Sequence, residues 1–357
     1  MGWRRWAITA GRVVEKRFDQ LKFQLKQQTG WLGQIEVLPY RGYGTPEALF
    51  MKGRVLEKKG ITQPSANDTV GTNLRNMVRR FASAEIPFAC VRARFGDHEV
   101  ETVADEEGFF DLRFELATPP STATAWHPVK VELLWPKENG VVAQATGSAL
   151  VPIGASFGVI SDLDDTVVRS RVTSFFKVVP ITLLNNAHTR LPFEGVASFY
   201  RALQRGGGGR EFNPIFYVSS SPWNLYDLLE DFLDVHGIPA GPLFLKDWSP
   251  TSIQDRDKHK LGVIRTLLVT YPKLPFVLIG DSGEKDPEIY HKVVQKHPGR
   301  IRAIYIRSVS TEERNTSVGA LAHEVRSLGV EMLLVPDTST AAEHATQRGF
   351  ILAECRP

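Results

Sequence analysis

Two carboxylates, two positions apart, follow a short apolar run near the middle of the chain. Phe157-Gly158-Val159-Ile160 predicts a buried strand, and Asp162-Leu163-Asp164-Asp165-Thr166 follows it closely. The first carboxylate, Asp162, can attack phosphorus as a nucleophile and form an aspartyl-phosphate. The second, Asp164, can hand a proton to the leaving oxygen and later activate water. Taken alone, the pentapeptide is equally compatible with an acidic N-cap after a strand.

Three later segments carry polar residues next to apolar runs. Asn213–Val218 is an apolar run that ends in Ser219-Ser220-Ser221-Pro222-Trp223. Lys258-His259-Lys260 precedes an apolar-periodic helix from Leu261 to Val269. Phe276–Ile279 ends in Gly280-Asp281-Ser282-Gly283-Glu284-Lys285-Asp286. In parallel sheets ligands bind outside the carboxyl ends of the strands, where we expect these motifs to meet.

In this order the motifs resemble those of the haloacid dehalogenase-like phosphatases: D-x-D-x-T, a strand-terminal Ser, a Lys, and G-D-x(4)-D. More narrowly, D-L-D-D-T, Y-V-S-S-S-P-W, H-K-L-G-V-I and L-I-G-D-S-G-E-K-D-P-E-I-Y are similar to the phosphatidate phosphatases related to the yeast actin-patch-associated enzyme. The resemblance covers residues 151 to 350. It implies hydrolysis of phosphatidate to diacylglycerol and phosphate. The proline-rich recruiting segments of the yeast relative have no counterpart in this sequence.

The chemistry also predicts a metal ion, because a phosphate dianion repels a carboxylate nucleophile. Mg²⁺ suits this position, since it prefers oxygen ligands and keeps some of its waters. We expect metal contacts from Asp162, Asp281 and the backbone carbonyl of Asp164, with Asp286 orienting a metal-bound water. Two alternatives remain open: a simple turn at Gly280-Asp281, and a helix N-cap role for Asp286.

Hydroxyl and amide groups complete the predicted phosphate site. We expect Ser219 to donate its hydroxyl to a phosphoryl oxygen. Ser221 and Pro222 suggest the N-cap and first residue of a helix, so the free amides around Ser220 would face the anion. With Thr166, which belongs to the D-x-D-x-T motif, these residues form the expected phosphate-binding set.

A lysine is predicted to neutralise both the phosphoryl group and the nucleophile. Lys260 fits this role because it begins the apolar helix as it does in the similar family, and Lys258 is its rival. The additional carboxylate of Asp165 stands where many phosphatidate phosphatases have Gly. It would either add negative charge near the metal or point away and hold the loop, and the sequence leaves both readings open.

From residue 156 onwards strand-like and helical patterns alternate. Apolar runs at 157–161, 214–219, 276–280, 301–306 and 331–335 alternate with helical patterns at 193–205, 224–235, 260–270, 286–296, 317–327 and 340–348. Alternation of this kind predicts an α/β domain over 153–357, with crossover helices on both faces of a parallel sheet. The resemblance specifies a haloacid-dehalogenase-like, doubly wound domain, and the short segment between the first two motifs leaves room only for a minimal cap.

Residues 30–152 show a different period and predict a β-sandwich domain. Phe110, Leu112, Phe114 and Leu116 alternate with charged residues, and Asp105-Glu106-Glu107-Gly108 predicts the turn before them. Val129, Val131, Leu133 and Trp135 form a second alternating set. A short basic helix is expected from Asn73 to Ser83, with its arginines solvated rather than forming a lipid-binding patch, which is the alternative.

Two segments are compatible with a lipid surface. Residues 1–29 predict a basic helix with Trp3 and Trp6, which either packs on the protein with its charges solvated or lies on an anionic membrane. We favour the first reading because Glu15 and Asp19 dilute the positive charge. The apolar segment from Phe175 to Leu184 either covers the sheet or forms a flap over a lipid phosphate.

The composition limits the class of protein. Of the 357 residues, 42% are hydrophobic and 23% are charged, which is ordinary for a soluble globular protein. Cys90 and Cys355 cannot form a disulfide framework, so a reducing compartment such as the cytoplasm is expected. No apolar run approaches the roughly 18 residues of a membrane span. A formal net charge of +3 is compatible with anionic lipid but too small to indicate nucleic acid.

The residues therefore predict a Mg²⁺-dependent phosphatase of phosphomonoesters that acts through an aspartyl-phosphate, and the resemblance implies that its substrate is phosphatidate. The expected partner is a phospholipid substrate, with peripheral binding to an anionic membrane left open and no nucleic acid expected. Two alternatives remain: a phosphatase of a soluble phosphomonoester, and a non-enzymatic lipid-surface adaptor.

Overall fold

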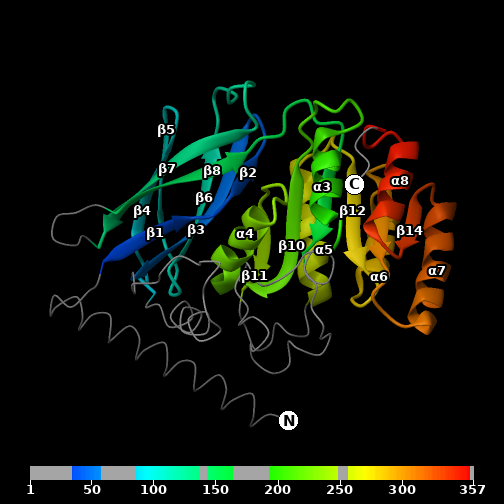
Figure 1. The fold of residues 1–357 in the computed structure, drawn as a ribbon. Helices are drawn as coiled ribbons and strands as arrows, with labels where there is room; N and C mark the ends of the chain where they lie inside the picture. The colour runs from blue at the N-terminus through cyan, green and yellow to red at the C-terminus, as the bar shows by residue number, and fades with distance from the viewer. Residues whose placement is uncertain (1–33, 58–84, 137–142, 164–192, 248–255, 354–357) are drawn as a thin grey trace, which may run out of the picture. The chain divides into compact units, whose positions relative to one another are not determined.

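The computed structural model describes residues 34–57, 85–136, 143–163, 193–247 and 256–353 (Figure 1). The described residues divide into two compact units. The first extends to Ala149 but leaves out Ser121–Ala125, and the second consists of Ser121–Ala125 and the residues from Leu150 onwards. Several predicted features lie outside the described residues: the helix at 1–29, the helix at 73–83, the apolar segment at 175–184, and Asp164, Asp165 and Thr166.

The first unit contains an eight-stranded sheet with antiparallel pairing in the order β1-β3-β2-β8-β7-β4-β5, with β6 paired to β3. Its strands are β1 (Ile35–Pro39), β2 (Gly42–Gly44), β3 (Ala48–Glu57), β4 (Cys90–Phe95), β5 (His98–Val103), β6 (Phe109–Glu115), β7 (Trp126–Trp135) and β8 (Gln144–Leu150).

Side-chain alternation explains why these segments are strands. In β6 the side chains of Phe110, Leu112 and Phe114 are buried while the charged residues between them are exposed, as predicted. The turn before β6 is also confirmed, because Oδ1 of Asp105 accepts hydrogen bonds from the amides two and four residues later. The expectation for Trp135 was wrong: it is the last residue of β7 and is 40% exposed.

The second unit is an α/β unit, which confirms the predicted class. Its six strands are β9 (Gly158–Asp162), β10 (Ile215–Pro222), β11 (Leu243–Lys246), β12 (Phe276–Asp281), β13 (Ile301–Arg307) and β14 (Glu331–Val335). They form a parallel sheet in the order β11-β10-β9-β12-β13-β14. The helices are α3 (Val196–Arg205), α4 (Tyr226–Val235), α5 (Arg256–Thr270), α6 (Asp286–Lys296), α7 (Glu312–Ser327) and α8 (Thr338–Gln347).

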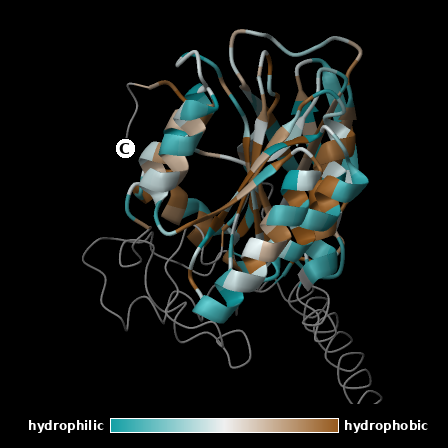
Figure 2. Cartoon of the chain, turned by 90° about the vertical axis from the view of Figure 1, so that its right-hand side faces the viewer, coloured by the Kyte–Doolittle hydropathy of each residue, from teal (hydrophilic) through white to brown (hydrophobic). Residues whose placement is uncertain are grey.

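Helices cover both faces of this sheet. Ile279 in β12 lies against residues of α3 and α8, whereas the neighbouring Gly280 approaches the first residue of α6. Successive strand residues point to opposite faces, so α3 and α8 lie on one side and α6 on the other. Figure 2 shows hydrophobic strands between helices whose outward faces are hydrophilic. Every residue of β9 and β12 is buried, as expected for strands covered on both faces.

Most of the predicted strands and helices of this unit are confirmed, with two differences. The short strand β11 was not predicted. Ser221 and Pro222 were expected to begin a helix, but they end β10, and α4 starts only at Tyr226 after a 3₁₀ turn at Trp223–Leu225. Among the described residues, no helix is long and apolar enough to cross a membrane.

Candidate active site

The order of the strands brings two predicted aspartates to the centre of the sheet. Counted along the chain from β9, the strand order is 3-2-1-4-5-6, so the order reverses between β9 and β12. Loops leave the two central strands in opposite directions at such a point, which opens a crevice at their carboxyl ends. Asp162 is the last residue of β9 and Asp281 is the last residue of β12. Both carboxylates therefore lie at the carboxyl ends of the two central strands, where the strand order reverses.

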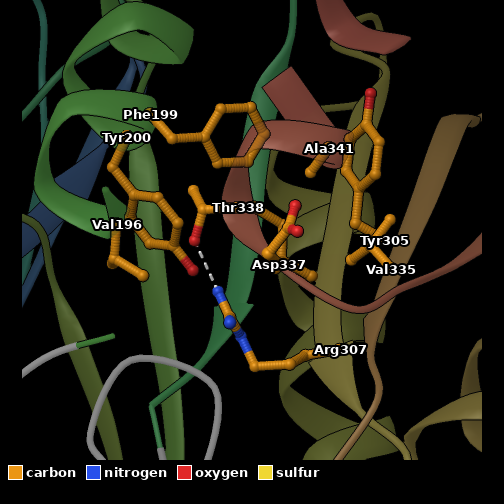
Figure 3. A pocket seen from close by; sticks show the side chains of 10 residues that line it. Val196, Phe199, Tyr200, Tyr305, Arg307, Val335, Asp337, Thr338 and Ala341 are labelled. Atoms are coloured by element: carbon orange, nitrogen blue, oxygen red, sulfur yellow. Dashed lines mark hydrogen bonds between the residues drawn. The ribbon is translucent and has the colours of Figure 1, made fainter. Parts of the chain in front are cut away.

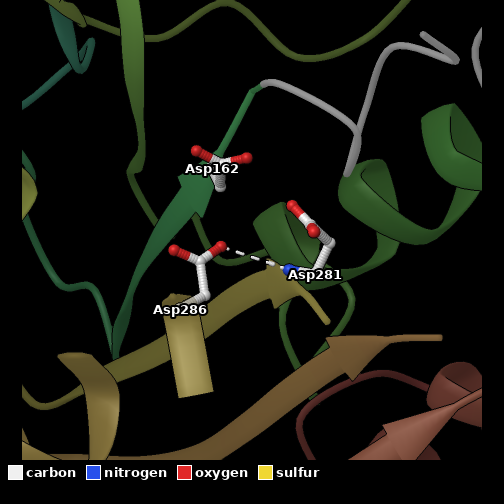
Figure 4. A group of neighbouring side chains, drawn as sticks. All are labelled: Asp162, Asp281 and Asp286. Carbon is white, nitrogen blue, oxygen red and sulfur yellow. Dashed lines mark hydrogen bonds between the residues drawn. The ribbon is translucent and has the colours of Figure 1, made fainter. Parts of the chain in front are cut away.

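A third carboxylate joins them from the first turn of α6 (Figure 4). One oxygen from each of Asp162, Asp281 and Asp286 lies within 4.8 Å of the others, and all three residues are buried. The sequence predicted that these three residues meet, and they do. Asp164 was predicted to belong to the same group but lies outside the described residues.

Hydrogen bonds fix the orientation of Asp281 and Asp286. Oδ1 of Asp281 accepts hydrogen bonds from the amides of Gly283 at 2.6 Å and Glu284 at 2.9 Å. Oδ2 of Asp286 accepts a hydrogen bond from the amide of Asp281 at 3.1 Å. The N-cap of α6 is Lys285, so the alternative of an N-cap role for Asp286 is wrong. Its carboxylate instead faces the strand that carries Asp281.

Lys260 supplies the positive charge of the cluster. Its Nζ lies 2.8 Å from Oδ1 of Asp162 and forms a short contact with Oδ1 of Asp286. Lys260 is 4% exposed, whereas its rival Lys258 is an exposed residue of the same helix. The structure therefore places Lys260, not Lys258, beside the proposed nucleophile.

The three carboxylates concentrate negative charge in a buried cluster. Among the described residues, the ammonium group of Lys260 contacts two of them, Asp162 and Asp286. Burial, followed by the charge of Asp286, raises the pKa of Asp281 to about 7, and burial also raises the pKa of Asp286. Burial lowers the pKa of Lys260, but Asp162 and then Asp286 outweigh it and hold that pKa well above its usual value.

The donor atoms of the cluster fit a metal ion. All are carboxylate oxygens, the kind of ligand that hard divalent cations prefer. Among the described residues, no hydrogen-bond donor reaches the buried Oδ2 of Asp281, although its Oδ1 has two. A buried carboxylate oxygen without a donor is costly unless a cation contacts it. Asp162, Asp281 and Asp286 could therefore hold a metal.

The predicted phosphate-binding serines lie on the strand beside Asp162. Val218 in β10 pairs with Asp162, and Ser219 follows it immediately. Ser219 is fully buried, and its Oγ accepts a hydrogen bond from the amide of Ser221 at 2.9 Å. Ser220 is half-buried at the same end of the strand. Thr166 lies outside the described residues.

Comparison with known proteins shows to which family the residues around this site are similar. Residues 157–308 match the family described as "Phosphatidate phosphatase APP1, catalytic domain". This segment belongs to the APP1 catalytic-domain family. The matched residues begin just before β9 and end after β13, so they contain Asp162, Ser219, Lys260, Asp281 and Asp286.

Two curated relatives agree with this assignment. The chain is 33% identical to phosphatidate phosphatase APP1 of Saccharomyces cerevisiae over 157 residues, which are 43% of this chain and 26% of the relative. It is 31% identical to an uncharacterized protein of Schizosaccharomyces pombe over 159 residues, which are 43% of this chain and 25% of that protein. The alignments thus span about a quarter of the length of these relatives.

Likeness to solved structures is much weaker. A carbohydrate acetylesterase from Xanthomonas citri has 12% sequence identity and a TM-score of 0.28, covering 73% of this chain and 66% of that chain. A β-glucuronidase from Ruminococcus gnavus has 10% identity and a TM-score of 0.23, covering 82% and 43%. Scores this low carry no argument about fold or function.

The site also contains residues that the sequence did not single out, and one of them, Arg314, lies beyond the matched residues 157–308. Glu284 places a carboxylate oxygen 3.3 Å from Nζ of Lys260. Arg314 in α7 contacts the loop between Asp281 and Asp286. A Cβ on Gly280 would lie 2.3 Å from Oδ2 of Asp286, which explains why the residue before Asp281 is glycine. The glycine and Glu284 stand inside the recognised motif, but no pattern in the sequence pointed to Arg314.

A small cavity, shown in Figure 3, lies beside β12, the strand that ends in Asp281. It is lined by residues of α3, β12, β13 and α8 together with Val335 and Asp337, and Arg307 donates a hydrogen bond to Oγ1 of Thr338 at 2.7 Å. Arg307 pairs with Asp281 in the sheet, so the cavity neighbours the active site. Its volume of about 20 Å³ has room for a single water molecule, which excludes it as a substrate pocket.

Proposed function

We propose that this chain is a Mg²⁺-dependent phosphatidate phosphatase that hydrolyses phosphatidate to diacylglycerol and phosphate. The observation that carries the proposal is the buried contact of Lys260 with Asp162 inside a cluster of three aspartates, in a segment of the APP1 catalytic-domain family. The yeast relative with 33% identity bears the name phosphatidate phosphatase, and this supports the choice of substrate.

In the proposed first step, an oxygen of Asp162 attacks phosphorus, and the bond from phosphorus to the glycerol oxygen breaks. Asp164 gives its proton to that oxygen, which leaves as the hydroxyl of diacylglycerol. In the second step Asp164 takes a proton from water, the water oxygen bonds to phosphorus, and Asp162 leaves as a carboxylate. The products are diacylglycerol and inorganic phosphate, and the enzyme returns to its starting state.

The other residues would bind and neutralise the phosphoryl group. Lys260 would stabilise the negative charge that the phosphoryl oxygens gather in the transition state. Ser219, the amides near Ser220, and Thr166 would donate hydrogen bonds to those oxygens. Asp162, Asp281 and the carbonyl of Asp164 would contact Mg²⁺, and Asp286 would hold one of its waters. When bound, the metal would lower the repulsion between the phosphate and the carboxylate nucleophile.

The proposal extends to the fold. Helices on both faces of a parallel sheet with the order 3-2-1-4-5-6 support a doubly wound, haloacid-dehalogenase-like domain at 153–357 with a minimal cap. For residues 30–152 we propose a β-sandwich, because Phe95 in β4 and Phe114 in β6 bring their rings to 6.2 Å although these strands are not paired. Residues 1–29 would then be a basic helix of its own, and the protein would act in the cytoplasm at the surface of a membrane.

Phosphate release from two substrates tests this function. Phosphatidate in mixed vesicles and a water-soluble phosphomonoester are each offered with Mg²⁺ and with EDTA. We expect release from the vesicles with Mg²⁺, little release from the soluble ester, and none from either substrate in EDTA. Equal turnover of both substrates would favour a phosphatase of soluble esters. Liposome binding without release from either substrate would favour a lipid-surface adaptor.

A further inference from the structure

Arg314 binds the loop that connects the two aspartates of the third motif. It lies in the first turn of α7, whose N-cap is Thr311. Its Nε donates to the carbonyl of Ser282 at 2.9 Å, and its Nη2 donates to the carbonyl of Glu284 at 2.8 Å. One guanidinium group therefore holds two carbonyl groups of the Asp281–Asp286 loop at the same time.

A single peptide group links Arg314 to Asp281. The carbonyl of Ser282 and the amide of Gly283 belong to the same planar peptide. The carbonyl accepts the hydrogen bond from Arg314, and the amide donates the 2.6 Å hydrogen bond to Oδ1 of Asp281. Hydrogen bonds in series polarise one another, so the charge of Arg314 strengthens the bond to Asp281. With Oδ1 held in this way, Oδ2 of Asp281 remains directed into the cluster.

Other contacts fix the guanidinium group in place. Both carboxylate oxygens of Glu288 in α6 accept hydrogen bonds from Arg314, one of them at 2.9 Å. This fork geometry fixes the plane of the guanidinium group as well as its position. Ser310 contacts the same loop, because its Oγ lies 2.7 Å from Oγ of Ser282.

We propose that Arg314 is a positioning residue that presents Oδ2 of Asp281 to the catalytic cation through the Ser282–Gly283 peptide. This role rests on the proposed function, because it assumes that Asp281 contacts Mg²⁺. Arg314 itself touches neither substrate nor metal. By restricting the motion of the Asp281–Asp286 loop, Arg314 increases the affinity of Asp281 for the cation.

The test compares Arg314→Met with Arg348→Met and with the wild type in the full-length protein. Arg348 also pairs with a glutamate, Glu331, at 2.7 Å, and neither residue is among the contacts of the Asp281–Asp286 loop. Mg²⁺ affinity is measured without substrate, by calorimetric titration and by the rise in unfolding temperature on adding Mg²⁺. The Mg²⁺ dependence of phosphatidate hydrolysis is measured in parallel.

We expect Arg314→Met to weaken Mg²⁺ binding about 10-fold or more, as is usual for residues that orient a metal ligand. Activity should recover at high Mg²⁺, with the KM for phosphatidate close to that of the wild type, and Arg348→Met should bind Mg²⁺ normally. Unchanged Mg²⁺ affinity in a folded Arg314→Met protein would overturn the inference and leave the proposed function standing. Absence of Mg²⁺ binding in the wild type would instead overturn the proposed function.

A second variant covers the case in which Arg314→Met does not fold. Glu288→Gln keeps the hydrogen bonds of Arg314 to the loop but removes the charge that fixes its guanidinium group. Its Mg²⁺ affinity should fall less than expected for Arg314→Met, but in the same direction. An affinity equal to that of the wild type would contradict the positioning role.

Discussion

Nζ of Lys260 and Oδ1 of Asp162 lie 2.8 Å apart, and both side chains are almost completely buried. Lys260 comes from α5 and Asp162 from the end of β9, so the contact joins residues nearly one hundred positions apart in the sequence. Asp286 makes a second contact with the same ammonium group. The lysine thus connects the proposed nucleophile with the carboxylate of the first residue of α6.

Loss of this lysine should remove most of the turnover. In Lys260→Met the transferred phosphoryl group loses its buried cation, and kcat should fall by about 10²–10³-fold, as is typical for one charge-stabilising group. Lys258→Met is the matched control, because Lys258 is an exposed residue two positions away in the same helix. Its kcat should stay close to that of the wild type. Equal losses in the two variants would contradict the role assigned to Lys260.

Glycine at position 280 should be essential for the geometry of the cluster. The Cβ introduced by Gly280→Ala would lie 2.3 Å from Oδ2 of Asp286, so that carboxylate must move away from the amide of Asp281. We expect a large loss of phosphatase activity and weaker stabilisation by Mg²⁺ in thermal unfolding. The control is Gly262→Ala, whose Cβ has nothing within 4 Å and lies in α5. It should keep full activity and gain about 0.5–1 kcal/mol of stability.

A buried asparagine should matter for stability rather than for chemistry. Oδ1 of Asn213 accepts hydrogen bonds from the amides of Ser156 and Phe157, and its Nδ2 donates to the carbonyl of Leu203. Asn213→Ala would leave buried backbone groups without partners, at a cost of about 1–3 kcal/mol each. Urea unfolding should therefore show a marked drop in the free energy of unfolding. A change within experimental error would show that these hydrogen bonds are replaced in the variant.

If the substrate is a lipid, the apolar segment from Phe175 to Leu184 is expected to contact the membrane. If the segment contacts a membrane, Phe175→Ser combined with Phe176→Ser should lower hydrolysis of phosphatidate in vesicles. Hydrolysis of a small soluble phosphoester, where measurable, should change little, because the metal and phosphate ligands remain. The measured quantity is the ratio of the two activities in variant and wild type. An unchanged ratio would assign these residues a structural role only.

The sequence predicted the elements of the site whose signals are local. Asp162, Ser219 and Asp281 each follow a buried apolar run, and the carboxyl ends of adjacent parallel strands meet at one edge of the sheet. The sequence placed Lys260 at the start of its helix, but α5 begins at Arg256 and Lys260 is its fifth residue. The choice between Lys260 and Lys258 required the structure, because only burial separates two lysines on one helix.

Other features depend on contacts between distant segments. Arg314 meets Ser282 only after β13 and the turn into α7 bring them together, and its neighbours Glu312 and Glu313 suggest an ordinary exposed helix start. The four residues of β11 are too few to show a period. At the end of β10, the hydrogen bond from the amide of Ser221 to Ser219 and the pairing of Pro222 with Lys246 replaced the helix start that the sequence suggested.

The covalent role of Asp162 is the central claim, and trapping the phospho-enzyme tests it most directly. Wild-type protein is mixed with phosphatidate vesicles and Mg²⁺, quenched in acid during turnover, and digested for mass spectrometry. We predict that the peptide with Asp162 gains the mass of one phosphoryl group, and that Asp162→Asn, although folded, shows neither this gain nor phosphate release. Substantial phosphate release by Asp162→Asn would contradict the account.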